Sequence, residues 1–194
     1  MGNKESTMPK LSKKQAEQRL DKADLDKLKN EWKQTTGMDA PKGEVSDIDT
    51  FAKIFDFDLK DEEQQDLARR FFKAFDVNGN GSLSYKEYIS AAAVVDKGSR
   101  DEKIALLFSV WDEDGDGCLT RDELRNIAAI YASPSMADKF VDDIFKSDTN
   151  ADGEISLKEF KHWLENSKSE MAAGLQDMFD DGSGAPPPAA ASAK

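Results

Sequence analysis

Residues 112–123 read DEDGDGCLTRDE, and the same pattern occurs twice more in this chain of 194 residues. Residues 76–87 read DVNGNGSLSYKE, and residues 148–159 read DTNADGEISLKE. The three segments begin 36 residues apart and share Asp at place 1, Asp or Asn at places 3 and 5, Gly at place 6 and Glu at place 12. Helical solenoids also have repeats of this length, but apolar and small residues mark those repeats, whereas acidic spacing marks these.

Helical periodicity flanks each of the three segments. Apolar residues recur every three or four positions before and after the loops, as they do on one face of an α-helix. Each unit is therefore predicted to be a helix, a loop and a second helix, and core packing is the plainest role for the apolar stripes. The stripes comprise Leu67, Phe71, Phe75, Tyr88, Ile89, Ile104, Leu107, Phe108, Trp111, Leu124, Ile127, Tyr131, Val141, Ile144, Phe145, Phe160, Trp163 and Leu164.

The composition is acidic and argues against several classes of protein. There are 27 Lys and Arg residues against 39 Asp and Glu residues, which gives a formal net charge of −12. This charge argues against a nucleic-acid partner, because phosphate backbones bind basic surfaces. The single cysteine, Cys118, excludes an internal disulfide framework and, without a secretory leader, predicts a reducing and therefore cytoplasmic location. No apolar run is long enough to predict a membrane-spanning helix.

The oxygen-bearing residues of the three segments have the spacing of a calcium-binding loop. Such a loop supplies ligands from places 1, 3, 5, 7, 9 and 12, with place 7 contributing its backbone carbonyl. Gly at place 6 permits a sharp turn, and Glu at place 12 favours calcium over magnesium because it can bind through both oxygens. Three Ca2+ sites are predicted. Their ligands are Asp76, Asn78, Asn80, Ser82 and Glu87, then Asp112, Asp114, Asp116, Cys118 and Glu123, then Asp148, Asn150, Asp152, Glu154 and Glu159.

Place 12 is also expected to lie in the first turn of the exiting helix. Ser or Thr at place 9 and Glu at place 12 form the pattern of a capping box, so movement of the glutamate toward an ion must move that helix. At the side-chain ligand places, the middle loop has four carboxylates, the last has three and the first has two. We therefore predict that the second and third loops bind calcium most tightly and act as a pair, joined by short strands at place 8.

A fainter fourth copy precedes these loops. A helical stripe ends at Trp32, and if Gly43 fills the glycine place, the loop begins at Met38. Its early ligand places then hold Met38, Ala40 and Lys42, none of which offers an anionic oxygen. No calcium site is predicted in this unit.

Together these features resemble the EF-hand calcium sensors, and among them the neuronal calcium sensor and calcineurin B-like group. Four helix-loop-helix units over about residues 22–168 carry the resemblance. Residues 40–43, APKG, look like the C-P-x-G segment that disables the first loop in neuronal calcium sensors, with Ala40 replacing the cysteine. The resemblance implies an all-α fold with two lobes of paired EF-hands, the first of the four units being degenerate.

The domain organisation follows from these units and from a helix stop at Gly98. Ser99 and Glu102 then form a capping box, so a hinge between the lobes is expected there. The predicted divisions are an N-terminal arm (1–21), an N-terminal EF-hand pair (22–95), a C-terminal pair (96–168), and a C-terminal helix with a flexible tail (169–194).

The N-terminus carries a lipidation pattern. Residues 1–6, MGNKES, fit an N-myristoylation acceptor at Gly2 once Met1 is removed. One acyl chain anchors a protein weakly, and the net charge of +3 over the first fifteen residues could supply a second signal by favouring an anionic membrane. The predicted consequence is reversible association with the cytoplasmic face of a membrane. The alternatives are an unmodified terminus and a solvated basic helix face.

The predicted function is that of a calcium-binding regulatory sensor. Calcium rotates the exiting helices, and a helix of a target protein then enters the apolar groove that opens. Candidates for the N-terminal groove, each with core packing as the alternative, are Trp32, Phe51, Phe55, Phe71, Phe75 and Tyr88. A C-terminal stripe that could cover a groove, or belong to a permanent core, comprises Met171, Leu175, Met178 and Phe179.

Two other functions remain open, and a catalytic one is disfavoured. A calcium buffer would bind the ion but barely open, and a permanent regulatory subunit of an enzyme such as a phosphatase would hold its partner regardless of calcium. No catalytic residues are predicted, because the single histidine, His162, has no partnered nucleophile in the sequence and Cys118 lies in a calcium loop.

Overall fold

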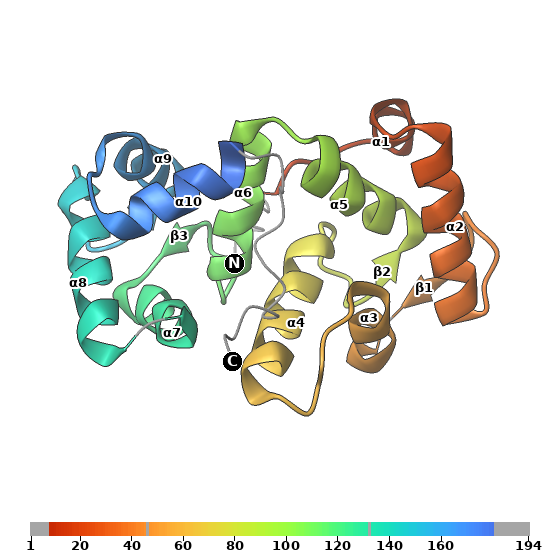
Figure 1. The fold of residues 1–194 in the computed structure, drawn as a ribbon, viewed down its shortest axis with the longest axis horizontal. Helices are drawn as coiled ribbons and strands as arrows, with labels where there is room; N and C mark the ends of the chain where they lie inside the picture. Colours follow the sequence, from red (N-terminus) through yellow and green to blue (C-terminus); the bar gives the residue numbers. More distant parts are fainter. Residues whose placement is uncertain (1–7, 46, 132, 181–194) are drawn as a thin grey trace.

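The computed structural model describes residues 8–45, 47–131 and 133–180, and these residues form a helical protein with two lobes (Figure 1). The observed fold confirms the all-α prediction. In chain order its elements are α1 (Lys13–Arg19), α2 (Lys22–Thr36), β1 (Glu44–Val45), α3 (Ile48–Phe55), α4 (Glu62–Phe75), β2 (Leu83–Ser84), α5 (Tyr85–Lys97), α6 (Arg100–Trp111), β3 (Cys118–Leu119), α7 (Arg121–Tyr131), α8 (Pro134–Ile144), the 3-10 helix η1 (Phe145–Ser147), β4 (Ile155–Ser156), α9 (Leu157–Asn166) and α10 (Glu170–Asp180).

Short antiparallel strands join the helix-loop-helix units in pairs. In one lobe β1 pairs with β2, which places Val45 opposite Leu83. In the other lobe β3 pairs with β4, which places Leu119 opposite Ile155. These four aliphatic side chains are buried and occupy place 8 of their loops, so the strand pairing expected at place 8 is present in both lobes.

Aromatic side chains fill the core of the N-terminal lobe. Phe51 is fully buried, and its ring lies 4.6 Å from that of Phe55 and 5.2 Å from that of Phe72 between centroids. Trp32 is also fully buried and packs against Tyr88 at 5.3 Å. In this state most of the aromatic residues proposed for a groove are therefore buried in the core. Phe55 is the exception, because its side chain is only half-buried.

The C-terminal lobe has a second aromatic core, which α10 partly covers. Trp111 and Phe160 meet edge to face at 5.3 Å. Helix α10 contacts α6 and α9, and Met171 and Leu175 pack half-buried against the core. This placement agrees with the expected apolar stripe after the last loop. Met178 and Phe179 lie in the last turn of α10, and their side chains are outside the described part of the chain.

The two lobes meet where α5 gives way to α6. Helix α5 ends at Lys97, and Ser99 caps α6 in a reciprocal capping box with Glu102, as the sequence predicts. A Cβ atom added to Gly98 would lie 2.2 Å from the carbonyl oxygen of Val94, so the close turn leaves no room for a side chain. The backbone φ of Gly98 is ordinary, so this restriction is steric and does not come from strain.

A helix that the sequence analysis did not single out, α1, packs against α5 (Figure 1). Ser12 and Gln15 form its capping box, a signal that is readable in the sequence as S-K-K-Q. Arg19 at its end makes a bidentate ion pair with Glu102, at 2.8 and 2.9 Å. Gly2 lies outside the described residues. No helix in the described part of the chain is long and apolar enough to cross a bilayer.

Candidate metal centres

Each of the three acidic loops begins at an aspartate that turns back toward the middle of its own loop. Asp76 and Asp112 accept hydrogen bonds from the place-6 amides of Gly81 and Gly117, at 2.7 and 2.9 Å. The same contact in the third loop measures 3.1 Å. The place-6 glycines have φ between 77° and 88°, a region that favours glycine, so their amides point inward.

The middle loop gathers the densest set of carboxylates. Ligand atoms of Asp112, Asp114 and Asp116 all lie within 4.8 Å of one another. Burial raises the pKa of Asp112, and the nearby charge of Glu123 raises it further. Hydrogen bonds from three loop amides lower this pKa but only partly offset the rise. Like charges this close repel one another, so the arrangement suits a divalent cation with hard oxygen ligands.

The place-12 glutamates connect the two ends of their loops, and each is only 7% exposed. One oxygen of Glu123 accepts hydrogen bonds from the backbone and hydroxyl of Thr120, at 2.8 and 2.7 Å. The other accepts from the amide of Glu113 at the start of the loop, at 2.8 Å. Glu87 and Glu159 have corresponding contacts at both ends of their loops. The expected capping boxes are present in all three exiting helices, which ties each carboxylate to a helix start.

The third loop contains a buried oxygen that lacks a partner. Oδ1 of Asp148 is inaccessible to solvent and makes no hydrogen bond within the described residues. An unsatisfied carboxylate oxygen in this place fits a cation ligand. Burial raises the pKa of Glu159 in the same loop, but hydrogen bonds from Ser156 and Thr149 outweigh burial and lower this pKa to about 2. Glu159 is therefore charged and available to a cation at neutral pH.

The first loop holds less charge. The side-chain amide of Asn78 donates to Glu87 at 2.7 Å, and the side-chain oxygen of Asn80 accepts from the amide of Ser82 at 2.9 Å. At place 7 of the other loops, the amides of Cys118 and Glu154 donate in the same way to the place-5 carboxylates, at 2.8 and 3.0 Å. The structure thus brings the predicted residues of each loop together around its turn.

The faint fourth copy keeps the turn but has no acidic residue at places 1, 3 and 5. Gly43 has φ 92°, and the residue at place 8, Val45, pairs with the neighbouring loop. The carbonyl of Lys42 accepts a hydrogen bond from the indole of Trp32 at 3.3 Å. The carbonyl oxygen of Lys42 is therefore hydrogen-bonded within the protein, and this unit contributes the strand β1 that pairs with β2.

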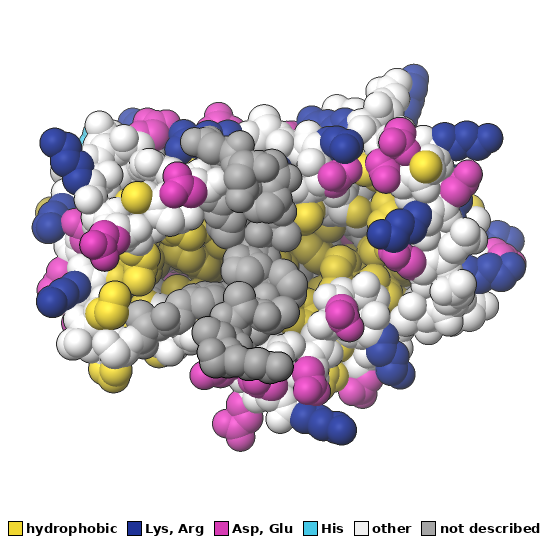
Figure 2. Space-filling model, in the orientation of Figure 1, with side chains coloured by type: hydrophobic (Ala, Val, Ile, Leu, Met, Phe, Trp, Pro, Cys, Tyr) yellow, Lys and Arg dark blue, Asp and Glu magenta, His cyan; other side chains and the backbone are white. Residues whose placement is uncertain are grey.

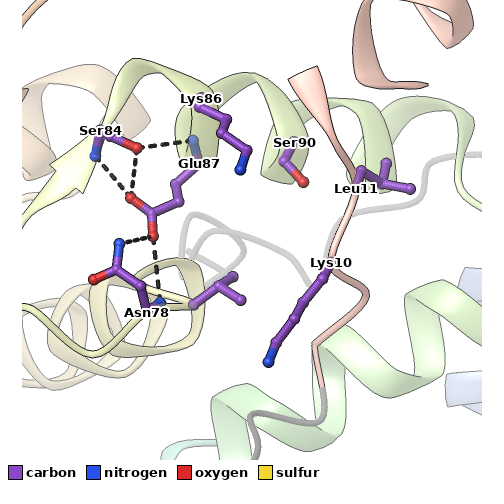
Figure 3. A pocket seen from close by; sticks show the side chains of 8 residues that line it. Lys10, Leu11, Asn78, Ser84, Lys86, Glu87 and Ser90 are labelled. Atoms are coloured by element: carbon purple, nitrogen blue, oxygen red, sulfur yellow. Dashed lines mark hydrogen bonds between the residues drawn. The ribbon is translucent and has the colours of Figure 1, made fainter. Parts of the chain in front are cut away.

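A cavity of about 270 Å3 lies between the first acidic loop and the segment that precedes α1 (Figure 3). Lys10 and Leu11 from this segment lie across the cavity from Asn78 and Glu87. No pattern in the sequence predicts that the N-terminal segment reaches an acidic loop. The burial of Leu11, which is 8% exposed, shows that this segment belongs to the folded lobe.

Comparison with known proteins agrees with this geometry. Residues 101–165 match the family described as an EF-hand domain pair, and residues 68–90 match the EF hand family. Guanylyl cyclase-activating protein 1 of Gallus gallus is 31% identical over 138 residues, which span 68% of this chain and 69% of that protein. The chain belongs to the EF-hand proteins of the neuronal calcium sensor and calcineurin B-like group. As a member of that group it is a calcium-binding regulatory sensor.

Two further relatives show the breadth of the group. Guanylyl cyclase-activating protein 2 of Lithobates pipiens is 30% identical over 165 residues, which span 77% of this chain and 81% of that protein. Calcineurin B of Candida glabrata is 29% identical over 116 residues, which span 57% of this chain and 66% of that protein. The first of these relatives is named as an activator of guanylyl cyclase and the second as a subunit of calcineurin, and this EF-hand protein is similar to both.

Proposed function

We propose that this EF-hand protein binds three Ca2+ ions and transmits their binding to a target protein. The three acidic loops, at residues 76–87, 112–123 and 148–159, would each hold one ion through the oxygen donors predicted above. The dense carboxylates of the middle loop and the unpartnered oxygen of Asp148 support cation sites in the C-terminal lobe. Because β3 and β4 join these two loops, we expect the two ions to bind as a pair, and because these loops have more carboxylates than the first loop, we expect them to bind more tightly there.

The contacts of the place-12 glutamates carry this proposal. Glu87, Glu123 and Glu159 each bond the start of the loop with one oxygen and the start of an exiting helix with the other. A calcium ion that binds both oxygens competes with these hydrogen bonds. Because the glutamate lies in the first turn of the exiting helix and its own amide donates to the place-9 hydroxyl, a displacement of its carboxylate would move that helix.

The surface that such a movement would open is apolar. Phe55, Phe72 and Val95 are half-buried against the N-terminal core. On the face of the molecule drawn in Figure 2, apolar side chains lie at the base of hollows. Among the described residues, Met136 is the only large hydrophobic residue that is strongly exposed, so most apolar surface is partly covered in this state. An amphipathic target helix is the partner that suits a groove of this kind.

The number of ions and the opening can be tested together. Native mass spectrometry should show three bound calcium ions, and Glu87→Gln, Glu123→Gln and Glu159→Gln should each remove one. Glu154→Gln is the matched control, because place 7 contributes its carbonyl, and this variant should keep all three ions. Calcium should also increase binding of a hydrophobic fluorescent probe. Retention of three ions by the place-12 variants would contradict the site assignment, and unchanged probe binding would indicate a buffer.

We extend the proposal to a reversible membrane association at the cytoplasmic face. Gly2 would be the myristoylated residue, and the basic N-terminal sequence would strengthen binding to anionic lipid. Mass spectrometry of the protein co-expressed with a myristoyltransferase should show the acyl group, and Gly2→Ala should lack it. The acylated protein should sediment with phosphatidylserine vesicles more than the variant does, and equal sedimentation would refute a membrane role for Gly2.

The similarity to calcineurin B favours a second candidate function, that of a permanent regulatory partner of an enzyme. In that case the protein would act on a catalytic chain without catalysis of its own, and a chelator would leave the complex intact. Co-purification with a larger chain in both calcium and chelator would support this alternative. Dissociation in chelator would support the sensor.

A further inference from the structure

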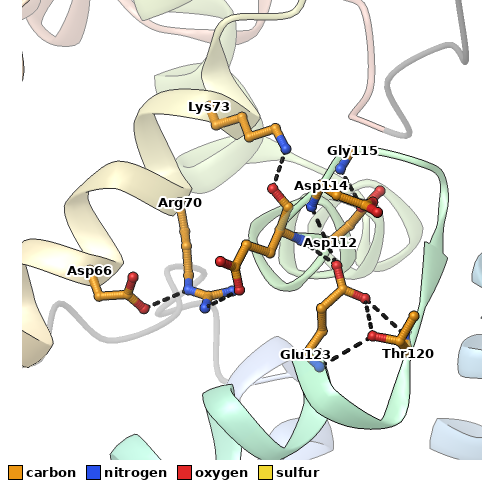
Figure 4. A network of polar contacts seen from close by, with 9 residues as sticks. Asp66, Arg70, Lys73, Asp112, Asp114, Gly115, Thr120 and Glu123 are labelled. Atoms are coloured by element: carbon orange, nitrogen blue, oxygen red, sulfur yellow. Dashed lines mark hydrogen bonds and ion pairs between the residues drawn. The ribbon is translucent and has the colours of Figure 1, made fainter.

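Helix α4 of the N-terminal lobe contacts the calcium loop of the C-terminal lobe at residues 112–123. The side chain of Arg70 binds Asp66 on its own helix at 2.7 Å and reaches across to Glu113 at 2.7 Å (Figure 4). One turn further along α4, Lys73 donates a hydrogen bond to the backbone carbonyl of Glu113. Place 2 of the second acidic loop is therefore held through both its side chain and its backbone.

The same residue, Glu113, connects α4 to a predicted calcium ligand. Its amide donates to Oε1 of Glu123, the place-12 glutamate, at 2.8 Å. One turn beyond Lys73, the C-terminal end of α4 is capped by Asp76, whose amide donates to the carbonyl of Phe72 at 3.0 Å. Asp76 is place 1 of the first acidic loop. A continuous set of contacts thus runs from the first loop, along α4, to the place-12 carboxylate of the second.

The Arg70 contact differs from an ordinary surface ion pair. Arg70 is 6% exposed, and its Nη1 atom is buried and finds no partner among the described residues. A buried guanidinium depends on its carboxylates, and Glu113 is one of the two that bind it. The neighbouring Arg69 is exposed and contacts Gln65 on its own helix, so it serves as a matched control.

We propose that Arg70 and Lys73 couple the calcium loop at residues 76–87 to the loop at residues 112–123 across the lobe boundary. This inference rests on the proposed function, since both loops must bind calcium. An ion in the first loop fixes Asp76 and therefore the end of α4. Through Arg70 and Lys73 the ordered helix holds Glu113, which preorganises the second loop for its own ion. By linkage, an ion in the second loop strengthens binding in the first by the same factor.

The test uses 15N-labelled full-length protein and a calcium titration followed by amide resonances. The amide of Gly117 bonds Asp112 and therefore reports the second loop separately from the others. Disabling the first loop with Glu87→Gln should weaken calcium binding at Gly117 by about fivefold or more, the lower end of measured couplings between sites. In an Arg70→Met background the same change should have less than a twofold effect. In an Arg69→Gln background the fivefold effect should remain.

Further measurements separate this inference from its premises. In calcium-free protein, Arg70→Met should shift the amide resonances of Glu113 and Gly115, and Arg69→Gln should not. If Arg70→Met folds poorly, Glu113→Gln provides the second test. This variant changes no predicted ligand, and it should also reduce the coupling. A fivefold effect that persists in Arg70→Met, or that is absent in the unmodified protein, would overturn the coupling. If Gly117 does not respond to calcium at all, the proposed calcium site itself is wrong.

Discussion

Removing the carboxylate of Asp143 should destabilise the C-terminal lobe, because this side chain joins three elements. Asp143 lies on α8, and its Oδ2 atom accepts hydrogen bonds from the indole of Trp163 at 2.8 Å and the hydroxyl of Ser167 at 2.7 Å. Its Oδ1 atom accepts from Lys146 at 2.9 Å. Trp163 is on the exiting helix of the same unit, so Asp143 links the incoming and exiting helices directly.

The magnitude follows from the exposure of these partners. Hydrogen bonds to a charged group contribute about 1.5–3 kcal/mol each, and Trp163 is only 3% exposed, so its indole would lose a buried acceptor. The side chain of Lys146 is 76% exposed, so its contribution is less than about 1 kcal/mol. Because Asp143 is itself 19% exposed and water can replace part of the loss, we expect Asp143→Ala to cost about 3 kcal/mol.

Urea unfolding of calcium-free protein, followed by far-UV circular dichroism and tryptophan emission, measures this loss. The control is the neighbouring Asp142→Ala, whose side chain is 70% exposed and pairs with Arg121 at the surface. The control should lose less than about 1 kcal/mol. A loss below about 1 kcal/mol for Asp143→Ala, or equal losses for the two variants, would refute the argument.

The same carboxylate gives a pH dependence with a defined sign. Burial raises the pKa of Asp143, but hydrogen bonds from Ser167, Lys146 and Trp163 outweigh burial and lower it below its usual range. A folded-state pKa below the unfolded value means that the stabilisation is fully present above about pH 4 and is lost as the pH falls further. The difference in unfolding free energy between the protein and Asp143→Ala should therefore shrink below about pH 4.

Three further variants test the packing. Gly98→Ala should lower the unfolding free energy by about 1–3 kcal/mol, because its Cβ meets the carbonyl of Val94; an unchanged chemical denaturation midpoint would contradict this steric argument. Phe51→Ala should cost about 3–5 kcal/mol by emptying the N-terminal aromatic core, and a loss under about 1 kcal/mol in the same assay would count against it. Arg19→Ala removes the bidentate contact to Glu102, so limited proteolysis should cut near α1 faster than in the unmodified protein.

Much of the candidate site could be predicted from the sequence because the relevant chemistry is local. Within twelve residues, the loop pattern specifies the place-1 aspartate, the place-6 glycine and the capping box at places 9 and 12. Hydrogen bonds between residues a few positions apart then form in all three loops, as in the contacts of Asp112 with Gly115 and Gly117. The helix stop at Gly98 was predictable for the same reason.

Contacts between distant segments could not be predicted in this way. The docking of α1 on α5, the path from Arg70 to Glu113, and the link from Asp143 to Trp163 join residues that no short pattern relates. Sequence alone also left open whether residues such as Trp32 and Phe51 line a groove or fill a core, since an apolar stripe is consistent with both.

The sequence by itself therefore determined the loops, their flanking helices and the lack of an acidic ligand set in the first unit, because those depend on side chains a few positions apart. Only the tertiary structure decided which helix touches which loop across the lobe boundary and which aromatic rings are buried. Those outcomes depend on how whole helical faces fit together, and side chains far apart in the chain share the resulting contacts.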